Sequence, residues 1–120
     1  MPSNCARGAR MKMAMNPLML LRARPAPAIR TEFEPWFRTV HMKDVSRIPG
    51  IIEARSARTA AGTHLGFFTF ESAEVVQSAM ASVEAAAARS AWERWGNNLE
   101  ELHVEIFAPL FSLPMYRTVN

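Results

Sequence analysis

The chain has 120 residues, of which 49% are hydrophobic and 21% are charged, as in an ordinary globular protein. This length provides about one domain with one core, which excludes large two-domain enzymes and repeat arrays. The formal net charge is +3, but three basic residues lie in the first 14 residues, which contain no acid. The rest of the chain carries 11 basic and 11 acidic residues, so it offers no general basic character for binding nucleic acid.

The two ends of the chain are expected to lie outside the domain. Cys5 is the one cysteine, so no intrachain disulfide can form. Arg22 interrupts the apolar run that begins at Pro17, which leaves it shorter than the roughly 7–15 residues of a signal peptide or the roughly 20 of a membrane span. We therefore expect a cytoplasmic protein that binds no membrane. Its parts are a flexible extension over residues 1–14, a domain over 15–108 and an apolar tail over 109–120.

The first strand and the first helix are predicted from apolar pattern and proline positions. A strand is expected over residues 15–24 and ends at prolines, which cannot donate to a ladder. The helix begins either at a capping box formed by Thr31 and Glu34 or at Pro35, since proline suits the first helical position. It is expected to end near residue 47, because a Pro-Gly pair follows.

The rest of the domain reads as a hairpin, a long helical segment and a last strand. Three further strands are predicted, over residues 50–59, 64–70 and 101–107. The helical segment covers residues 72–95, with Ser72 as a good N-cap. One unbroken helix of that length would span about 36 Å, which overshoots the strands, so a break is expected near Ser82 or Ser90.

This β-α-β-β-α-β order is the ferredoxin-like arrangement, an α+β fold with a four-stranded antiparallel sheet and helices on one face. The other face would be bare, and we expect Phe68, Phe70 and their neighbours to lie on it. A large apolar patch of this kind is unfavourable in water. The sequence therefore predicts a homodimer, with two sheets face to face and a cavity between them.

Three segments carry a family resemblance. They are Phe37-Arg-Thr-Val-His-Met-Lys-Asp-Val-Ser-Arg-Ile-Pro-Gly50, Glu53-Ala-Arg55 and Leu65-Gly-Phe-Phe-Thr-Phe-Glu71. Together they resemble the dimeric α+β barrel superfamily, and most closely its EthD-like branch, over about residues 15–107. Trp92-Glu-Arg-Trp95 is similar to the tryptophan-bearing segment before the last strand of that family. The resemblance implies a cofactor-free homodimer with an apolar pocket in each subunit. It leaves the reaction open among lyases, isomerases, cyclases and monooxygenases.

His41 and Asp44 are the first catalytic candidates. They lie three residues apart on the predicted helix and are therefore neighbours on its surface. On a regular helical wheel they share a stripe with Trp36, Phe37 and Val40. A carboxylate can fix the tautomer of an imidazole and raise its basicity, as a general base requires. The resemblance also implies an acid/base role for His41. The alternative is a histidine that only stabilises the helix end, where its charge favours the dipole.

His64 is a third catalytic candidate, on the same strand face as Gly66, Phe68 and Phe70. A glycine in a strand often marks the close approach of a ligand, so Gly66 is a candidate substrate contact. The resembling family has a tyrosine or another aromatic residue at the position of His64, which is a departure from its pattern. The alternative is a histidine at the hairpin end that reaches water.

His103 and Glu105 are candidate substrate contacts on the last strand. They are two residues apart and point to the same side, either as a base and a carboxylate that face a cavity or as the wet face of an edge strand. The histidines have neither His-x-His nor His-x₃-His spacing, so no metal site is expected. A nucleophile elbow, a phosphate-binding glycine loop and a Cys–His pair are also missing from the sequence.

These features favour a small cofactor-independent enzyme of the lyase, isomerase or cyclase type that moves a proton on an apolar, aromatic or polyketide-like molecule. His41, held by Asp44, would move the proton. The substrate would be held by Trp36, Phe37, Phe68 and Phe70. One alternative is a non-catalytic homodimeric module for hydrophobic-ligand binding or assembly, and another is a cofactor-free monooxygenase. An open cavity with His41 on its wall would favour the enzyme, and a cavity filled by Phe and Met would favour the module.

Overall fold

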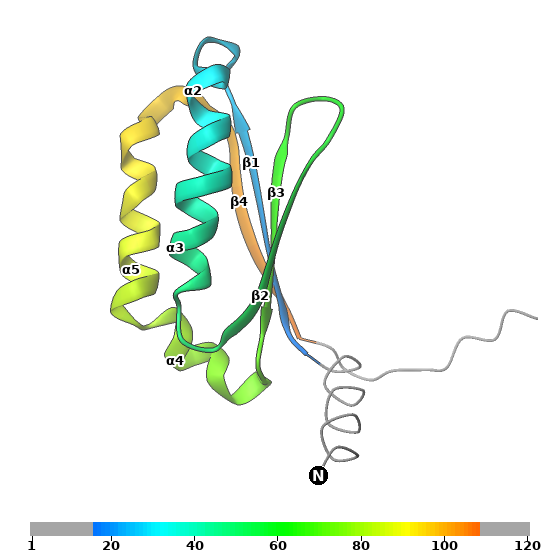
Figure 1. The fold of residues 1–120 in the computed structure, drawn as a ribbon, viewed down its shortest axis with the longest axis vertical. Helices are drawn as coiled ribbons and strands as arrows, with labels where there is room; N and C mark the ends of the chain where they lie inside the picture. Colours follow the sequence, from blue (N-terminus) through cyan, green and yellow to red (C-terminus); the bar gives the residue numbers. More distant parts are fainter. Residues whose placement is uncertain (1–15, 109–120) are drawn as a thin grey trace, which may run out of the picture.

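Four strands form one antiparallel sheet in the order β2–β3–β1–β4 (Figure 1). The computed structural model describes residues 16–108, and the expected extension (1–14) and tail (109–120) lie outside the described residues. The strands are β1 (Leu18–Pro25), β2 (Ile51–Arg58), β3 (His64–Phe70) and β4 (Leu99–Phe107). This order and the alternation of strands with helices confirm the predicted ferredoxin-like α+β fold.

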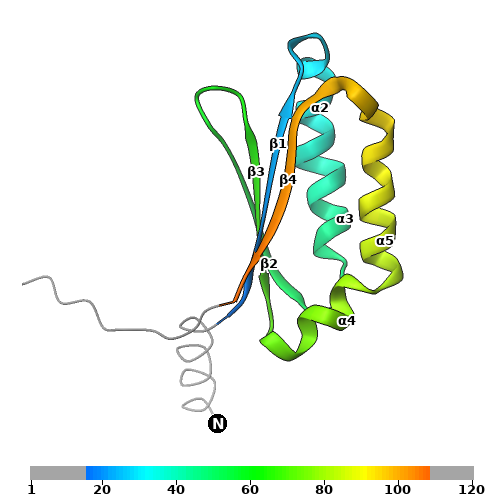
Figure 2. The same ribbon diagram turned by 180° about the vertical axis from the view of Figure 1, so that it is seen from behind.

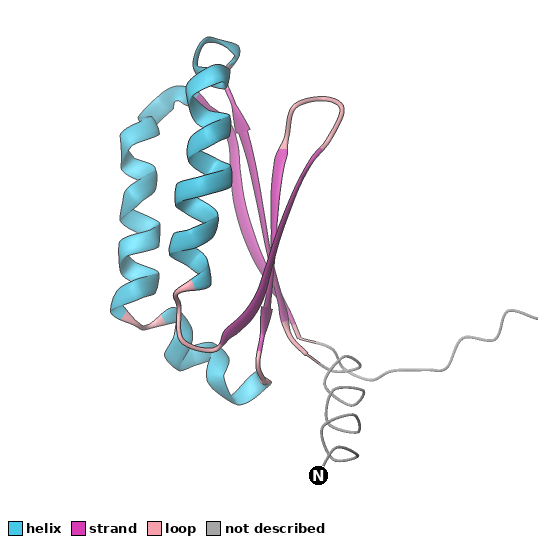
Figure 3. Cartoon of the chain, in the orientation of Figure 1, coloured by secondary structure: helices cyan, strands magenta, loops and turns pink. Residues whose placement is uncertain are grey.

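The helices lie together on one face of the sheet (Figures 1 and 2), and Figure 3 separates the two layers by colour. One helical run contains η1 (Pro27–Ile29), α2 (Arg30–Pro35), η2 (Trp36–His41) and α3 (Met42–Ser46). The other contains η3 (Ala73–Val75), α4 (Val76–Met80), α5 (Val83–Ser90) and η4 (Ala91–Asn98). Within residues 16–108, none of these helices has the length and apolar character to cross a membrane.

The first helical run begins at Pro27, and both predicted starts are wrong. Pro27 takes the first helical position without any side-chain cap, because its fixed φ already suits a helix. Pro35 lies inside the run and is followed by a π-helical turn, in which the N–H of Met42 donates to the carbonyl of Phe37. A proline lacks the N–H that a regular helix needs and crowds the preceding turn, and a wider turn accommodates such a disturbance.

The π-helical turn decides which residues of the run face the sheet. A wider turn aligns residues that are four apart, and Phe33, Phe37, His41 and Val45 are all buried. Val40, which the regular wheel placed in the same stripe, is 43% exposed. The face of this helix therefore differs from the one expected for a regular helix.

The second helical run breaks at Ser82, one of the two predicted positions. The Ser82 hydroxyl accepts a hydrogen bond from the N–H of Ala85 at 3.1 Å and donates to the carbonyl of Ala79 at 2.7 Å. Ser72 stands at the start of the run, as predicted, but its side chain makes no capping bond. The last part of the run, η4, is kinked at Gly96, whose φ of 50° suits a glycine.

The core lies between the helices and the sheet. Phe68 and Phe70 are fully buried there, so the expectation that they lie on the bare face of the sheet is wrong. Phe67, which pairs with Leu20, lies on the outer face instead. The sequence has apolar residues on both faces of β3, and a strand pattern of this kind does not distinguish the two sides.

Candidate functional site

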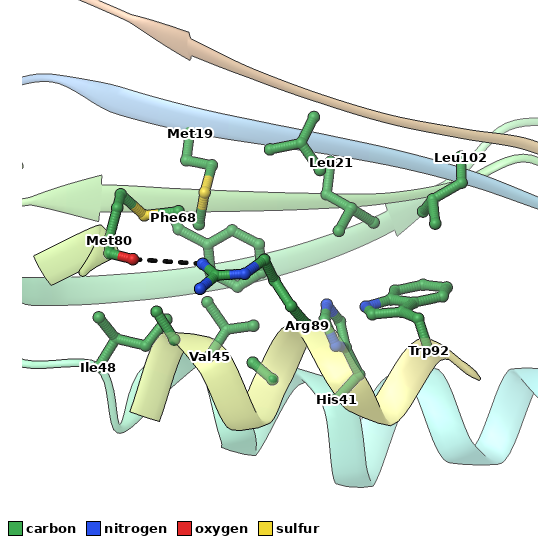
Figure 4. Close-up of a pocket in the computed structure, with 13 residues that line it drawn as sticks. Met19, Leu21, His41, Val45, Ile48, Phe68, Met80, Arg89, Trp92 and Leu102 are labelled. Carbon is green, nitrogen blue, oxygen red and sulfur yellow. Dashed lines mark hydrogen bonds between the residues drawn. The ribbon is translucent and has the colours of Figure 1, made fainter. Parts of the chain in front are cut away.

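A cavity of about 360 Å³ lies between the helices and the sheet, and we call it the helix-side cavity (Figure 4). Strands β1, β3 and β4 form one wall through Met19, Leu21, Phe68, Leu102 and Val104. Leu102 and Val104 are each 46% exposed, so the cavity opens beside β4. The lining is almost entirely hydrocarbon, which suits an apolar ligand. The sequence led us to expect a cavity between two sheets, whereas this one lies within a single chain.

His41 lies on the wall of the helix-side cavity, opposite the strands (Figure 4). Its side chain is 2% exposed and is surrounded by aromatic rings. It stacks on Trp36 and Phe37, with ring centroids 5.5 and 5.4 Å away. The Trp92 ring stands edge-on to it, with the two ring centroids 4.7 Å apart. This environment orients the imidazole ring without any polar neighbour.

Neither ring nitrogen of His41 has a hydrogen-bond partner among the described residues. Burial disfavours the charged form of an imidazole, and it lowers the pKa of His41 to about 4. The ring is therefore neutral at pH 7, with one nitrogen able to donate a hydrogen bond and the other able to accept one.

Asp44 is not brought to His41. Its carboxylate lies 3.7 Å from the guanidinium of Arg47, toward the surface. The two residues are three apart at the start of the regular helix α3, but the His41 ring packs among Trp36 and Phe37. In this structure no carboxylate raises the basicity of the imidazole.

His64 faces a different pocket. Its ring is 3% exposed and packs against Phe33 and Phe37, each with centroids 5.3 Å away. It lines a pocket of about 200 Å³ together with Arg30, Arg58 and residues 59–62. We call this the turn-end pocket, because the β2–β3 turn forms one side of it. The two candidate histidines therefore do not act in one site, and Phe37 lies between them.

Among the other predicted contacts of the first helix and of β3, some line the helix-side cavity and others do not. Phe68 lines the helix-side cavity, whereas Trp36 stands behind His41 and Phe70 is buried without lining either pocket. A Cβ on Gly66 would lie 2.7 Å from the ring of Phe68. The notch beside Gly66 is thus filled by that ring and is not open to a ligand.

His103 and Glu105 lie on the outer face of the sheet, away from the helices, as their pairing with Arg22 and Leu20 shows. Their side chains are about half exposed, and the His103 Nε2 is 3.7 Å from a carboxylate oxygen of Glu105. They point the same way, as predicted, but they do not line the helix-side cavity.

Of the residues that line the helix-side cavity, only His41 and Phe68 were among the predicted site residues. Trp92 and Arg89 both line the helix-side cavity, and Arg89 donates to the carbonyl of Met80 at 3.2 Å (Figure 4). A signal existed in the spacing, because Ala85, Ala88 and Trp92 form a buried stripe with Arg89 at its margin. Arg89 is the one cationic side chain other than histidine in the described lining.

Neither a family model nor a curated protein matches this chain. Several solved structures do match. A monooxygenase encoded by ActVA-Orf6 of Streptomyces coelicolor, solved with nanaomycin D, aligns with a TM-score of 0.61 and 12% identity, over 85% of this chain and 94% of the other. A cofactor-independent oxygenase, SnoaB of Streptomyces nogalater, aligns with a TM-score of 0.60 and 17% identity, over 83% and 98%.

An EthD family protein of Bacillus halodurans aligns with a TM-score of 0.57 and 20% identity, over 74% of this chain and 96% of the other. At these identities the similarity establishes the fold. The resemblance to the dimeric α+β barrel superfamily and its EthD-like branch is confirmed at that level. The chain has the ferredoxin-like α+β fold that these monooxygenases and EthD family proteins share.

Proposed function

We propose that this chain is a small cofactor-independent enzyme that binds an apolar, aromatic or polyketide-like molecule in the helix-side cavity and moves a proton with His41. One observation carries the proposal: on the wall of a hydrocarbon cavity, both nitrogens of a 2% exposed imidazole have no hydrogen-bond partner within residues 16–108. A buried polar group without a partner costs about 1–3 kcal/mol. A ligand that brings an oxygen or an acidic hydrogen to this ring gains that energy.

The low pKa of His41, about 4, limits the chemistry. An efficient general base has a pKa near the working pH, so this imidazole is weak as a free base. When it takes a proton from a carbon beside a carbonyl, the electron pair moves to the carbonyl oxygen as an enolate. The imidazolium and the enolate then attract each other strongly in a low-dielectric cavity. Arg89, on the same wall, can stabilise the enolate oxygen.

The test uses 2-tetralone, a bicyclic aromatic ketone with an acidic CH₂ group between its ring and its carbonyl. Hydrogen–deuterium exchange at that carbon is followed by NMR. We expect the protein to accelerate the exchange, and His41→Phe to lower the acceleration by about 10²- to 10⁴-fold. This variant keeps a ring in the aromatic stack and removes both nitrogens.

Val40→Phe is the matched control, because it adds a ring in the same helical turn at a position 43% exposed. It should catalyse hydrogen–deuterium exchange of 2-tetralone at the wild-type rate. Equal acceleration in wild type and His41→Phe would remove His41 from the reaction.

A cofactor-free oxygenase is the second candidate, and the likeness to a monooxygenase and to a cofactor-independent oxygenase favours it. In that reaction the CH₂ group loses a proton to His41, the enolate reduces O₂, and the carbon becomes a carbonyl as water leaves. An oxygen electrode separates the two candidates. Oxygen uptake that His41→Phe abolishes would favour the oxygenase, and exchange without uptake would favour proton transfer.

The helix-side cavity also bears on the binding module. The Phe and Met side chains of residues 16–108 do not fill it, since about 360 Å³ is open beside His41. The open cavity supports the enzyme over the module. A higher melting temperature with apolar ketones, in the absence of both exchange and oxygen uptake, would favour the module.

We further propose that a second copy covers the outer face of the sheet. Leu18, Leu20, Leu65 and Phe67 lie on that face, and no helix of residues 16–108 packs there (Figure 2). Sedimentation should give a dimer of the 13.5 kDa chain, and Leu20→Glu should dissociate it. Val83→Glu, at an exposed position of α5, should leave the dimer intact. A monomeric wild type would exclude this arrangement.

A further inference from the structure

The turn-end pocket shares no lining residue with the helix-side cavity. Arg30 comes from α2, Arg58 from the end of β2 and His64 from the start of β3, and the turn over residues 59–62 connects the two strands. The turn is fixed by a hydrogen bond from the N–H of Thr59 to the carbonyl of Thr63 at 2.9 Å. These residues come from three separate elements and converge on one space of about 200 Å³.

Gly62 allows a guanidinium to lie close to the turn. A Cβ built on Gly62 would be 3.6 Å from both the Cζ and one terminal nitrogen of Arg30. Gly62 also has a φ of +97°, which a residue with a side chain rarely adopts. The turn and Arg30 are therefore packed together as one side of the pocket.

The charge around this pocket is positive. Three guanidiniums, those of Arg30, Arg38 and Arg58, and one carboxylate, that of Glu34, act on the His64 ring. Glu34 pairs with Arg58 at 3.0 Å. Among the ion pairs of residues 16–108, none involves Arg30 or Arg38. The cluster therefore holds more guanidiniums than its one carboxylate can neutralise.

His64 adds a buried polar group to the cluster. It is 3% exposed, with Phe33 and Phe37 behind it and the turn-end pocket in front. Burial lowers its pKa, the guanidiniums of Arg58, Arg30 and Arg38 lower it further, and Glu34 opposes them. A negative charge placed in the pocket would favour the protonated ring.

We propose that the turn-end pocket is a binding site for a small oxyanion, namely a carboxylate or phosphate group, held by Arg30, Arg58 and His64. The planar guanidinium carries several donors in a fork that matches the oxygens of both groups. The His64 ring supplies a further donor from the floor. The ligands of this site are small anions, whereas those of the helix-side cavity are apolar molecules. Anion binding here does not depend on whether His41 is catalytic.

The experiment follows the ring signals of the three histidines by NMR while inorganic phosphate or succinate is added to the full chain. His64→Gln assigns the His64 signal. We expect this signal to move saturably with at least one anion, and the pKa of His64 to rise when the anion is bound. His41, which lies in the other cavity, should not move and reports that the fold is intact.

Arg30→Gln and Arg58→Gln should each weaken the anion affinity about tenfold or more. Arg55→Gln is the matched control, because Arg55 lies on the same strand, on the opposite face, in an ion pair with Glu53 at 3.1 Å. Its affinity should equal that of the wild type. A response to phosphate alone assigns a phosphate group, and a response to succinate alone assigns a carboxylate. The proposal is overturned if neither anion moves His64, or if Arg55→Gln weakens binding as much as Arg58→Gln.

Discussion

His41 and His64 lie on two sides of the same ring and have different surroundings. Both are nearly fully buried, and their centroids are 5.4 and 5.3 Å from that of Phe37. The cavity around His41 is aromatic and aliphatic apart from Arg89, whereas several charged groups surround the pocket side of His64. Burial lowers the pKa of both. We therefore expect the groups across each pocket, more than burial, to determine which ligand each histidine can bind.

Phe37 holds the two sites apart, and removing its ring should produce the largest effect. Phe37→Ala should lower the free energy of unfolding by about 3–5 kcal/mol, as large-to-small changes at fully buried aromatic positions do. Urea denaturation measures this, and the NMR signals of both His41 and His64 should shift. Phe37→Leu, which keeps more of the volume, should show smaller changes of the same sign.

Val83→Ala is the control for Phe37→Ala, because it truncates an apolar side chain at a position of α5 that is 78% exposed. It should change the free energy of unfolding by less than about 1 kcal/mol, in keeping with a surface site. If Phe37→Ala shifted only one histidine signal, Phe37 would not be the shared wall of the two sites.

The second prediction uses pH to separate the histidines. A histidine whose pKa is lowered on folding stabilises the protein fully above its unfolded pKa, and this stability is lost as the pH falls through the folded pKa. For His41 the window runs from about 6.5 down to about 4, and the total loss is about 3 kcal/mol. The free energy of unfolding should therefore fall between pH 6.5 and pH 4.

His41→Phe should remove most of this pH dependence, because the ring remains and the titrating nitrogens do not. His64→Phe should remove a part with the same sign, since the pKa of His64 is also lowered. Urea denaturation at a series of pH values measures both slopes. A slope that is unchanged in His41→Phe would mean that this ring is not buried as a neutral group.

Gly66→Ala should change ligand binding at the helix-side cavity and not at the turn-end pocket. The added Cβ would lie 2.7 and 2.8 Å from two ring atoms of Phe68, so that ring must move, and it lines the helix-side cavity. We expect a loss of about 1–3 kcal/mol in unfolding free energy, as for other overpacked sites. Binding of apolar ketones should change, while anion binding at the turn-end pocket should not.

Ser56→Ala controls for the strand pairing in that experiment, because Ser56 is the cross-strand partner of Gly66 and is exposed. It should leave both ligands unaffected. Equal changes in ligand binding at both pockets in Gly66→Ala would show that the two sites are coupled through the packing of the core.

Much of the fold could be predicted from local patterns. The three later strands, the hairpin and the break at Ser82 follow from alternation, turn residues and a capping serine, all of which act within a few residues. The face of the first helix could not be predicted in this way. It depends on the π-helical turn after Pro35, and a regular wheel therefore placed Val40 and Asp44 in the buried stripe.

The site was predicted less completely than the fold, since it depends on contacts between distant segments. His41 and Phe68 line one cavity, but the sequence had led us to expect a cavity between two sheets, on the other face of the strand that holds Phe68. The separation of His64 from His41 depends on how Phe37 packs between β3 and the helix. Arg58 and Glu34, 24 residues apart, meet only once the sheet and helix have docked. No pattern within one segment contains that information.

The smallest expected effect belongs to Asp44→Asn, and it bears directly on the contrast between the histidines. Asp44 lies 3.7 Å from Arg47, whose side chain is 65% exposed, and such surface pairs contribute about 0–1 kcal/mol. The free energy of unfolding should change by less than about 0.5 kcal/mol, and 2-tetralone exchange should match the wild type.

In wild type the exchange rate should also be independent of pH above about 5, since the neutral His41 has a pKa of about 4. An imidazole supported by a carboxylate would instead titrate at about 6.5 or higher. A tenfold loss of exchange in Asp44→Asn, with Arg47→Gln unaffected, would mean that the carboxylate reaches His41 when substrate is bound. His41 would then lie, like His64, in a site with charged side chains. The two pockets would differ only in the ligands that they bind.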